Sequence, residues 1–185
     1  MKKILKGTTA LSPVPVVMAT CGTQENANIV TLAWVGTVNS EPPVLTACVR
    51  YGRHSYPLIK ESGEFTVNLV SRDLVAAADR CGLVSGKNTD KFALCGLHKG
   101  KGVAVSCPYI EESPVALECR VIKEVDLKTH AVFFGEIVNV LADERYVDDK
   151  GKLSLPEGLL VGYVGGNYVE TGAKIGAIGF SLTRK

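Results

Sequence analysis

Residues 28–55 constrain the fold of this chain more strongly than any other stretch. In the first half, 28–39, apolar residues occupy alternating positions, with small or hydroxylated residues such as Thr31 and Ala33 between them. The apolar positions are Val30, Leu32, Trp34 and Val38. A period of two predicts one β-strand with a buried face and a presented face. A long flat molecule could lie against the presented face.

A second strand follows a turn that two prolines stiffen. Pro42 and Pro43 cannot donate backbone hydrogen bonds, so strand pairing pauses there, and the apolar run 44–49 resumes it. The strand leads into Arg50–Ser55, which holds two arginines, a histidine and a serine, with Gly52 allowing a close turn. Arginines, hydroxyls and backbone amides together can bind phosphate. On these residues alone, a solvated loop with ordinary surface charges is the alternative.

Length and composition indicate one globular domain, residues 1–185. A domain of this size buries roughly 70% of the surface that its unfolded chain exposes. Hydrophobic residues make up 46% and charged residues 22%, which excludes a disordered chain. The net charge of +2 provides no basic stripe for nucleic acid, so we expect no nucleic-acid partner.

The segments outside 28–55 are read mainly as further short strands, with a few short helices between them. Strands are predicted at 16–21, 64–70, 115–125 and 128–141, and helices at 56–62 and 72–81. About seven strands with inserted helices indicate a closed or nearly closed antiparallel barrel, because an open sheet would expose unpaired edges. We therefore predict a mainly β, Greek-key split β-barrel.

Targeting signals and cysteine spacing both favour a cytoplasmic protein. The basic start of the chain is interrupted by Gly7, Pro13 and Pro15 before an apolar signal core forms, and no run approaches the roughly 20 residues that cross a bilayer. The six cysteines lack zinc-ligand spacing, so we expect no metal site and read them as reduced, packed thiols. Cys48 lies in a strand of the proposed site and is also read as packing.

Two polar residues next to strands have a structural and a functional interpretation. Asn68 is expected on a strand face with little polar company, where its amide could meet the polar edge of a heterocycle or could be satisfied at a strand end. Ser55 could be the N-cap of the helix that begins near Pro57, or could bind phosphate with the helix amides.

Lys91 and His130 likewise have both a structural and a functional interpretation. Lys91 lies in Asp90-Lys91-Phe92 and can be either a solvated lysine or an anion ligand. His130 opens a strand, where a lone histidine is most often a surface or capping residue.

Eight landmarks follow one another along the chain. They are Pro13-Val14-Pro15, Asn28-x-x-Thr31-x-Ala33-Trp34, Ser40-x-Pro42-Pro43, Ser62–Asn68, Asp90-Lys91-Phe92, Glu118-Cys119, His130-x-x-Phe133-Phe134-Gly135-Glu136 and Tyr163-x-Gly165-Gly166-x-Tyr168. They cover roughly residues 10–180, and it is the ordered set that is specific. This set resembles the flavin reductase-like, FMN-binding split-barrel family, in particular its flavoredoxin-type branch.

The resemblance implies a non-covalently bound FMN and assigns residues to it. The residues expected to contact FMN are Thr31, Leu32, Ala33, Trp34, Val49, Arg50, His54, Ser55, Asn68, Lys91 and Tyr168. Within this set, 31–34 contact the ring, Asn68 contacts its polar edge, and Arg50, His54, Ser55 and Lys91 bind the phosphate. His130 is the expected catalytic residue, and with Tyr168 it shapes the nicotinamide or substrate side.

The resemblance also implies an activity and an assembly. NAD(P)H delivers hydride, and the flavin passes electrons to free flavin, a redox protein or another acceptor. The alternative is a non-catalytic FMN electron-transfer protein that a partner protein reduces. The implied assembly is a homodimer with FMN near the interface, to which the segment 165–168 contributes. No membrane partner is expected.

Overall fold

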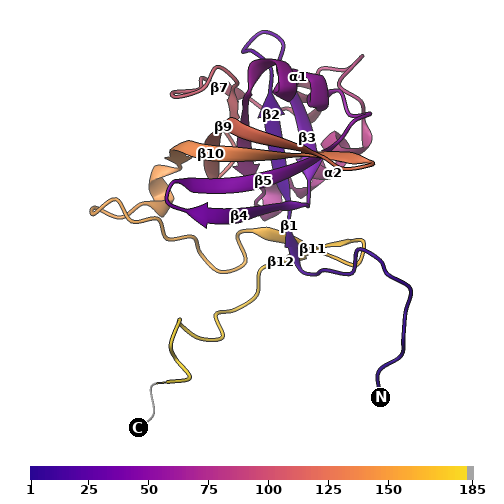
Figure 1. The fold of residues 1–185 in the computed structure, drawn as a ribbon. Coiled ribbons are helices and arrows are strands. Elements are labelled where there is room, and N and C mark those ends of the chain that lie inside the picture. Colours follow the sequence, from indigo (N-terminus) through magenta and orange to yellow (C-terminus); the bar gives the residue numbers. More distant parts are fainter. Residues whose placement is uncertain (183–185) are drawn as a thin grey trace.

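A seven-stranded antiparallel sheet dominates the computed structural model, which describes residues 1–182 (Figure 1). The last three residues of the predicted domain 1–185 lie outside the described part. In chain order the strands are β2 (Val17–Cys21), β3 (Asn28–Leu32), β4 (Val35–Ser40), β5 (Pro43–Arg50), β6 (Glu64–Leu69), β9 (Val115–Asp126) and β10 (His130–Ala142). Their order in the sheet is β3-β2-β6-β9-β10-β5-β4. The prediction of a mainly β chain with a curled sheet is confirmed.

The predicted single strand over 28–39 is wrong. Strand β3 ends at Leu32 and β4 begins at Val35, and the two strands occupy opposite edges of the sheet. Between them the chain leaves β2 and joins β5, where the Cys48 amide donates a hydrogen bond of 3.1 Å to the Trp34 carbonyl. Two residues therefore connect the two edges, so the sheet must curl. The proline turn from β4 to β5 is confirmed by the pairing of Ser40 with Pro43.

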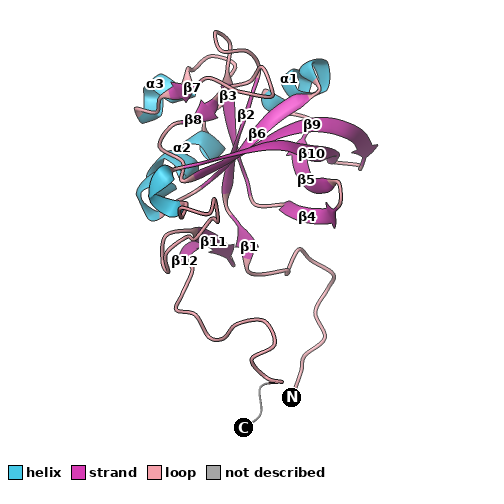
Figure 2. Cartoon of the chain, turned by 90° about the vertical axis from the view of Figure 1, so that its left-hand side faces the viewer, coloured by secondary structure: helices cyan, strands magenta, loops and turns pink. Residues whose placement is uncertain are grey.

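Two small sheets lie outside the main one (Figure 2). Strand β1 (Val14–Pro15) pairs with β11 (Val161–Val164), which pairs with β12 (Asn167–Glu170). The turn between β11 and β12 uses Gly165 and Gly166 at φ 55° and 92°, a conformation that favours glycine. Strands β7 (Lys99–Gly100) and β8 (Tyr109–Ile110) form the other pair.

The helices are short, as predicted. They are α1 (Ser55–Ser62), α2 (Val75–Leu83) and α3 (Lys91–Cys95), with 3₁₀ turns η1 (Arg72–Leu74) and η2 (Glu144–Tyr146). Gly63 ends α1 in the left-handed conformation at φ 68°, as expected of a terminal glycine. Gly82 lies inside α2, which continues to Leu83. An added Cβ there would lie 3.4 Å from the Thr31 Cβ, so α2 packs directly on β3.

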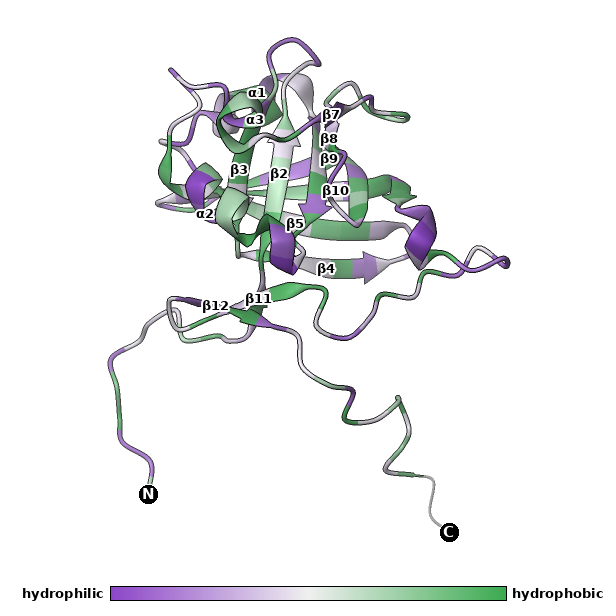
Figure 3. Ribbon diagram, turned by 180° about the vertical axis from the view of Figure 1, so that it is seen from behind, coloured by the Kyte–Doolittle hydropathy of each residue, from purple (hydrophilic) through white to green (hydrophobic). Residues whose placement is uncertain are grey.

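Each face of the sheet packs against its own apolar cluster. One cluster fills the inside of the curled sheet and includes Phe65 and Phe133. The other lies between the sheet, α2 and α3 and includes Met18, Ile29 and Phe92. Hydrophobic colours along β2, β3 and β5 mark this pattern in Figure 3.

Within residues 1–182, no helix combines the length and the apolar composition that crossing a bilayer requires.

A substitution at Gly135 tests how tightly the interior of the sheet is packed. An added Cβ would lie 2.6 Å from the Phe65 ring and 3.0 Å from the Cys119 Cβ, both of which are buried. We expect Gly135→Ala to lower the free energy of unfolding by about 1–3 kcal/mol, because the core must shift to accept the methyl group. Urea unfolding measures the change.

The matched control is Gly36→Ala on the exposed strand β4, where an added Cβ meets no atom within 4 Å. It should leave the stability unchanged or raise it slightly, by up to about 1 kcal/mol, because alanine restricts the unfolded chain. Equal effects of the two substitutions would contradict the packing described for Gly135.

Candidate functional site

A hollow of about 240 Å³ opens where the chain leaves β3, and we call it the β3 hollow. It is lined by Thr31, Leu32, Ala33, Trp34, Cys48, Arg50, Arg53 and His130. Six of these residues were selected from the sequence: Thr31, Leu32, Ala33, Trp34, Arg50 and His130. The structure therefore brings together residues from β3, β5, β10 and the loop before α1.

Arg50, His130 and Trp34 form the outer wall of the β3 hollow. The register of β5 and β10 and the turn at Trp34 bring them together. Arg50 ends β5 directly opposite His130, the first residue of β10. The turn carries Trp34 across to the same place, where its ring lies 4.9 Å from the His130 ring at 43°. Trp34 remains 44% exposed, which is unusual for the single tryptophan of a packed chain. A flat molecule can reach both rings.

A second hollow of about 240 Å³ adjoins the first through Thr31, Leu32 and Ala33, which line both. We call it the tyrosine hollow, because Tyr163 and Tyr168 line its far side. The Tyr168 hydroxyl donates a hydrogen bond of 2.9 Å to Asp79. Burial, with Asp79 as a further cause, raises the pKa of Tyr168 to about 12. This phenol therefore stays protonated near neutral pH.

A third hollow, of about 480 Å³, adjoins the β3 hollow on its other side, and we call it the arginine hollow. Arg50 and Arg53 line both hollows. Both are exposed, and within residues 1–182 neither guanidinium has a hydrogen bond or an ion pair. Guanidinium groups without partners are suited to a phosphate or carboxylate, which they can bind through two parallel hydrogen bonds.

Sequence reasoning missed two residues of the β3 hollow, Arg53 and Cys48. Arg53 belongs to the predicted anion loop but was not selected from it. From this strand Val49 was selected instead of Cys48. The Val49 side chain does not line the hollow, because it is fully buried in the core. Alternation along β5 carried the signal, because Cys48 and Arg50 share a face on which Val49 cannot lie.

Asn68 lies in the core and lines none of the three hollows. Its side chain is fully buried, donates to the Met18 carbonyl at 2.9 Å, and accepts from the Ile110 amide at 2.8 Å. The expected contact with the polar edge of a ligand is therefore wrong for this structure. The reason is that the β7-β8 segment covers the face of β6 on which Asn68 lies.

Ser55 and Lys91 are also buried. The Ser55 hydroxyl accepts a hydrogen bond of 2.7 Å from the Asn28 amide, and the N-cap of α1 is His54 rather than Ser55. Lys91 donates bonds of 2.7 Å to the carbonyls of Ile29 and Cys81, and burial lowers its pKa. These two residues join β3, α1 and α2 behind the hollows. His54 is half-buried and lines none of the hollows.

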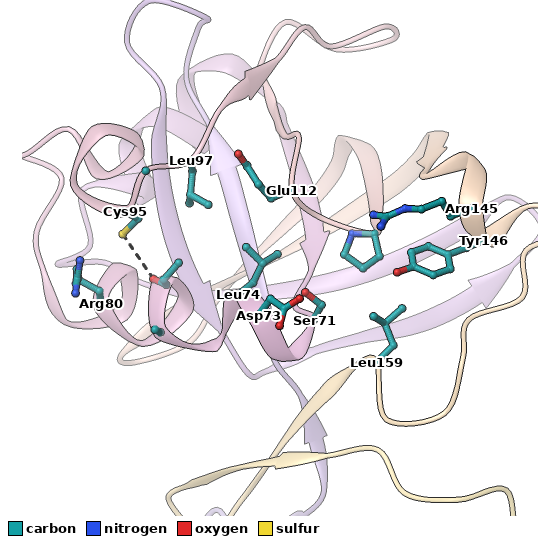
Figure 4. Close-up of a pocket in the computed structure, with 14 residues that line it drawn as sticks. Ser71, Asp73, Leu74, Arg80, Cys95, Leu97, Glu112, Arg145, Tyr146 and Leu159 are labelled. Carbon is teal, nitrogen blue, oxygen red and sulfur yellow. Dashed lines mark hydrogen bonds between the residues drawn. The ribbon is translucent and has the colours of Figure 1, made fainter.

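A cavity of about 550 Å³, larger than each of the three hollows, contains none of the predicted residues (Figure 4). Most of its charged residues already have partners. Arg145 forms an ion pair with Asp143, and Glu112 accepts hydrogen bonds from His98. Size alone therefore does not identify the binding site. The β3 hollow combines accessible aromatic rings with guanidinium groups that have no partner among the described residues. Among the described residues, no cluster of three or more side chains could hold a metal ion.

The pKa of His130 reports on the electrostatics of the β3 hollow. Burial is the first cause and Arg50 the second, and both lower this pKa below its ordinary 6.5. We expect Arg50→Gln to raise the pKa of His130 towards 6.5, because it removes a positive charge while the burial remains. NMR titration of the imidazole signals measures it. His98, whose pKa Glu112 raises, is the internal control and should not move. A His130 pKa that falls or stays constant contradicts the assignment.

Comparisons with known proteins support the fold. The family model described as a flavin reductase like domain matches residues 9–171. The flavoredoxin of Desulfovibrio vulgaris (Miyazaki F) is 32% identical, with a TM-score of 0.88 over 96% of this chain and 97% of that one. The flavoredoxin of Methanosarcina acetivorans is 31% identical, with a TM-score of 0.88 over 99% and 100%. The predicted split-barrel fold is confirmed.

Curated proteins give weaker but consistent matches. An uncharacterised protein of Archaeoglobus fulgidus is 33% identical over 126 residues, which are 68% of this chain and 71% of that protein. The FMN reductase (NADH) RutF of Enterobacter cloacae is 28% identical over 113 residues, 60% of this chain and 65% of RutF. With the match to the family model, these findings establish that the chain belongs to the flavin reductase-like family.

Proposed function

We propose that the chain binds FMN non-covalently across the three hollows and acts as an NAD(P)H-dependent flavin reductase of the flavoredoxin type. One observation carries the proposal: the guanidinium groups of Arg50 and Arg53 have no partner in the described chain, and they border a hollow with an accessible Trp34–His130 pair. FMN has two groups that complement this arrangement: a flat ring for the aromatic pair and a phosphate for the guanidinium groups. The solved flavoredoxins and RutF support this choice of cofactor.

The residues that would hold the flavin follow from which side chains are accessible. Thr31, Leu32 and Ala33 border both the β3 hollow and the tyrosine hollow, so they are suited to a ring that extends between the two. Arg50 and Arg53 would bind the phosphate. Ser55 and Lys91, the other expected phosphate ligands, are assigned to support instead, since both are buried and hydrogen-bonded.

The bound flavin would accept a hydride from a nicotinamide and pass on electrons, and the protein would orient the reactants. Trp34 and His130 form an aromatic wall at the open side of the hollow. His130, with its lowered pKa, is neutral near pH 7 and can donate one hydrogen bond and accept another. It is therefore suited to positioning a substrate amide without adding charge. Tyr168 contributes a hydroxyl group on the far side of the tyrosine hollow.

The proposed assembly is a homodimer with FMN near the interface. Each separate hollow of the monomer except the arginine hollow is smaller than the roughly 300–1,000 Å³ of typical ligand pockets. A second subunit would deepen them, and Trp34, which is 44% exposed, lines the β3 hollow. A cytoplasmic location is proposed on separate grounds: all six cysteines are free thiols, as reducing compartments favour.

Removing the two guanidinium groups tests the phosphate assignment. We expect Arg50→Gln with Arg53→Gln to weaken FMN binding at least tenfold, because a hydrogen bond to a charged group contributes about 1.5–3 kcal/mol. Binding of riboflavin, which lacks the phosphate, should change little. Fluorescence quenching of each flavin measures both affinities.

The matched control is Lys101→Gln with Lys123→Gln, which removes two exposed positive charges away from the three hollows. It should leave both affinities close to those of the wild type. If the arginine variant loses FMN and riboflavin equally, the phosphate assignment is wrong even though a flavin binds. If neither affinity changes, the β3 hollow is not the flavin site.

Anaerobic mixing with NADH and with NADPH separates the reductase from the electron carrier. We expect the flavin absorption band of the FMN-loaded protein to bleach with at least one of the two nucleotides. Trp34→Ala should slow bleaching more than it weakens FMN binding, because the aromatic wall lies at the open side. Persistent colour with both nucleotides, together with reduction by dithionite, would favour the alternative, a protein that a redox partner reduces.

A further inference from the structure

Cys81 and Cys95 form a pair of thiols in contact, outside the three hollows. Their Sγ atoms are 3.6 Å apart, one on α2 and the other on α3. Within residues 1–182, no second pair of cysteine sulfurs is in such contact. A disulfide requires about 2.05 Å, so the two sulfurs would have to approach by roughly 1.5 Å. We propose that this pair is a dithiol–disulfide site that reacts with the disulfide of a small zwitterionic thiol bound in the cavity of about 550 Å³.

The two sulfurs differ in their access to solvent. Cys95 is half-buried and lines the cavity of about 550 Å³, at the end where Arg80 lies (Figure 4). Cys81 is fully buried, and burial, with Cys95 as a further cause, raises its pKa to about 12. Cys95 therefore meets the oxidant first, and Cys81 is the resolving thiol behind it.

The lining of the cavity selects the class of oxidant. Arg80 lies beside Cys95, donates one hydrogen bond to the Leu94 carbonyl, and has no carboxylate partner in the described chain. Asp73 supplies negative charge, while Leu74 and Leu97 supply an apolar floor. A molecule with both carboxylate and ammonium groups complements this arrangement. Disulfides of amino acids or short peptides have that chemistry.

The reaction balances without any other reactant. The Cys95 thiol loses its proton, and the thiolate attacks one sulfur of the small disulfide, so that a mixed disulfide forms and one small thiolate leaves and takes a proton. The Cys81 thiol loses its proton and attacks the Cys95 sulfur, and the second small thiol leaves. The protein loses two protons and two electrons, and the small disulfide gains them as two thiols.

The bond would join two helices that lie behind the flavin site. Two carbonyl groups of helix α2 accept hydrogen bonds from other elements. The Ala78 carbonyl accepts one from the Thr31 hydroxyl, and the Cys81 carbonyl accepts one from the Lys91 ammonium group of α3. A link between Cys81 and Cys95 would fix these two helices to each other. It would also change the wall of the cavity, since Cys95 would turn away from it towards Cys81.

The experiment incubates the full-length protein with oxidised glutathione and, separately, with the neutral disulfide of 2-mercaptoethanol. Mass spectrometry of the intact protein and of its peptides follows the products. We expect the wild type to lose two hydrogen atoms and to yield a peptide pair linked through Cys81 and Cys95. Oxidised glutathione should react at least several-fold faster than the neutral disulfide, and Arg80→Gln should abolish that preference.

Three cysteine variants complete the test. Cys81→Ser should stop at a mixed disulfide on Cys95, and Cys95→Ser, at a half-buried position, should form neither product. Cys48→Ser removes the other half-buried cysteine, which lines the β3 hollow, and is the matched control for the thiol reaction alone: it should form the Cys81–Cys95 link as the wild type does, whatever its effect on flavin binding. Should Cys81→Ser fail to fold, Cys95→Ser and the peptide map still decide. Absence of the linked peptide, or a mixed disulfide that forms only at Cys48, overturns the proposal. Equal rates with both disulfides overturn the choice of oxidant.

Discussion

The turn at Ala33 and Trp34 is the constraint on which the rest of the molecule depends. The preceding strand pairs with β2, and the hydrogen bond from the Cys48 amide to the Trp34 carbonyl brings the following residues to β5. Because these partners lie far apart in the sheet order, two residues connect its edges and the sheet has to curl. A continuous strand would have paired Trp34 within the sheet. The turn instead places its ring beside His130 and leaves an opening beneath it.

Two guanidinium groups without a hydrogen-bond partner distinguish this opening. Other exposed arginines form ion pairs, such as Arg72 with Glu170 and Arg145 with Asp143. Within residues 1–182, Arg50 and Arg53 have no partner, which costs little because both remain in water. They keep their full capacity for an anionic ligand. The buried Lys91 differs, because its charge is satisfied by carbonyl groups and supports the structure.

Local signals predicted the elements well, and non-local packing decided the rest. The proline turn, the helix that begins at Ser55 and the strand that begins at His130 depend on neighbouring residues, and the structure contains them. Asn68 and Ser55 are buried and hydrogen-bonded to Ile110 and Asn28, respectively. These partners are distant in the sequence, and no local pattern identifies them. The break after Leu32 was equally hidden, because alternation of apolar residues continues across it.

Helix α2 connects the proposed flavin site with the dithiol behind it. It packs directly on β3, since a Cβ at Gly82 would be in van der Waals contact with Thr31, a residue that borders two of the hollows. The same helix holds Cys81, whose carbonyl accepts from Lys91 of α3. A change in how α2 and α3 meet would therefore reach Thr31 through one rigid turn of helix, since the Thr31 hydroxyl is bonded to Ala78. The packing that shapes the hollows thus also provides the path by which oxidation of the dithiol would act on flavin binding.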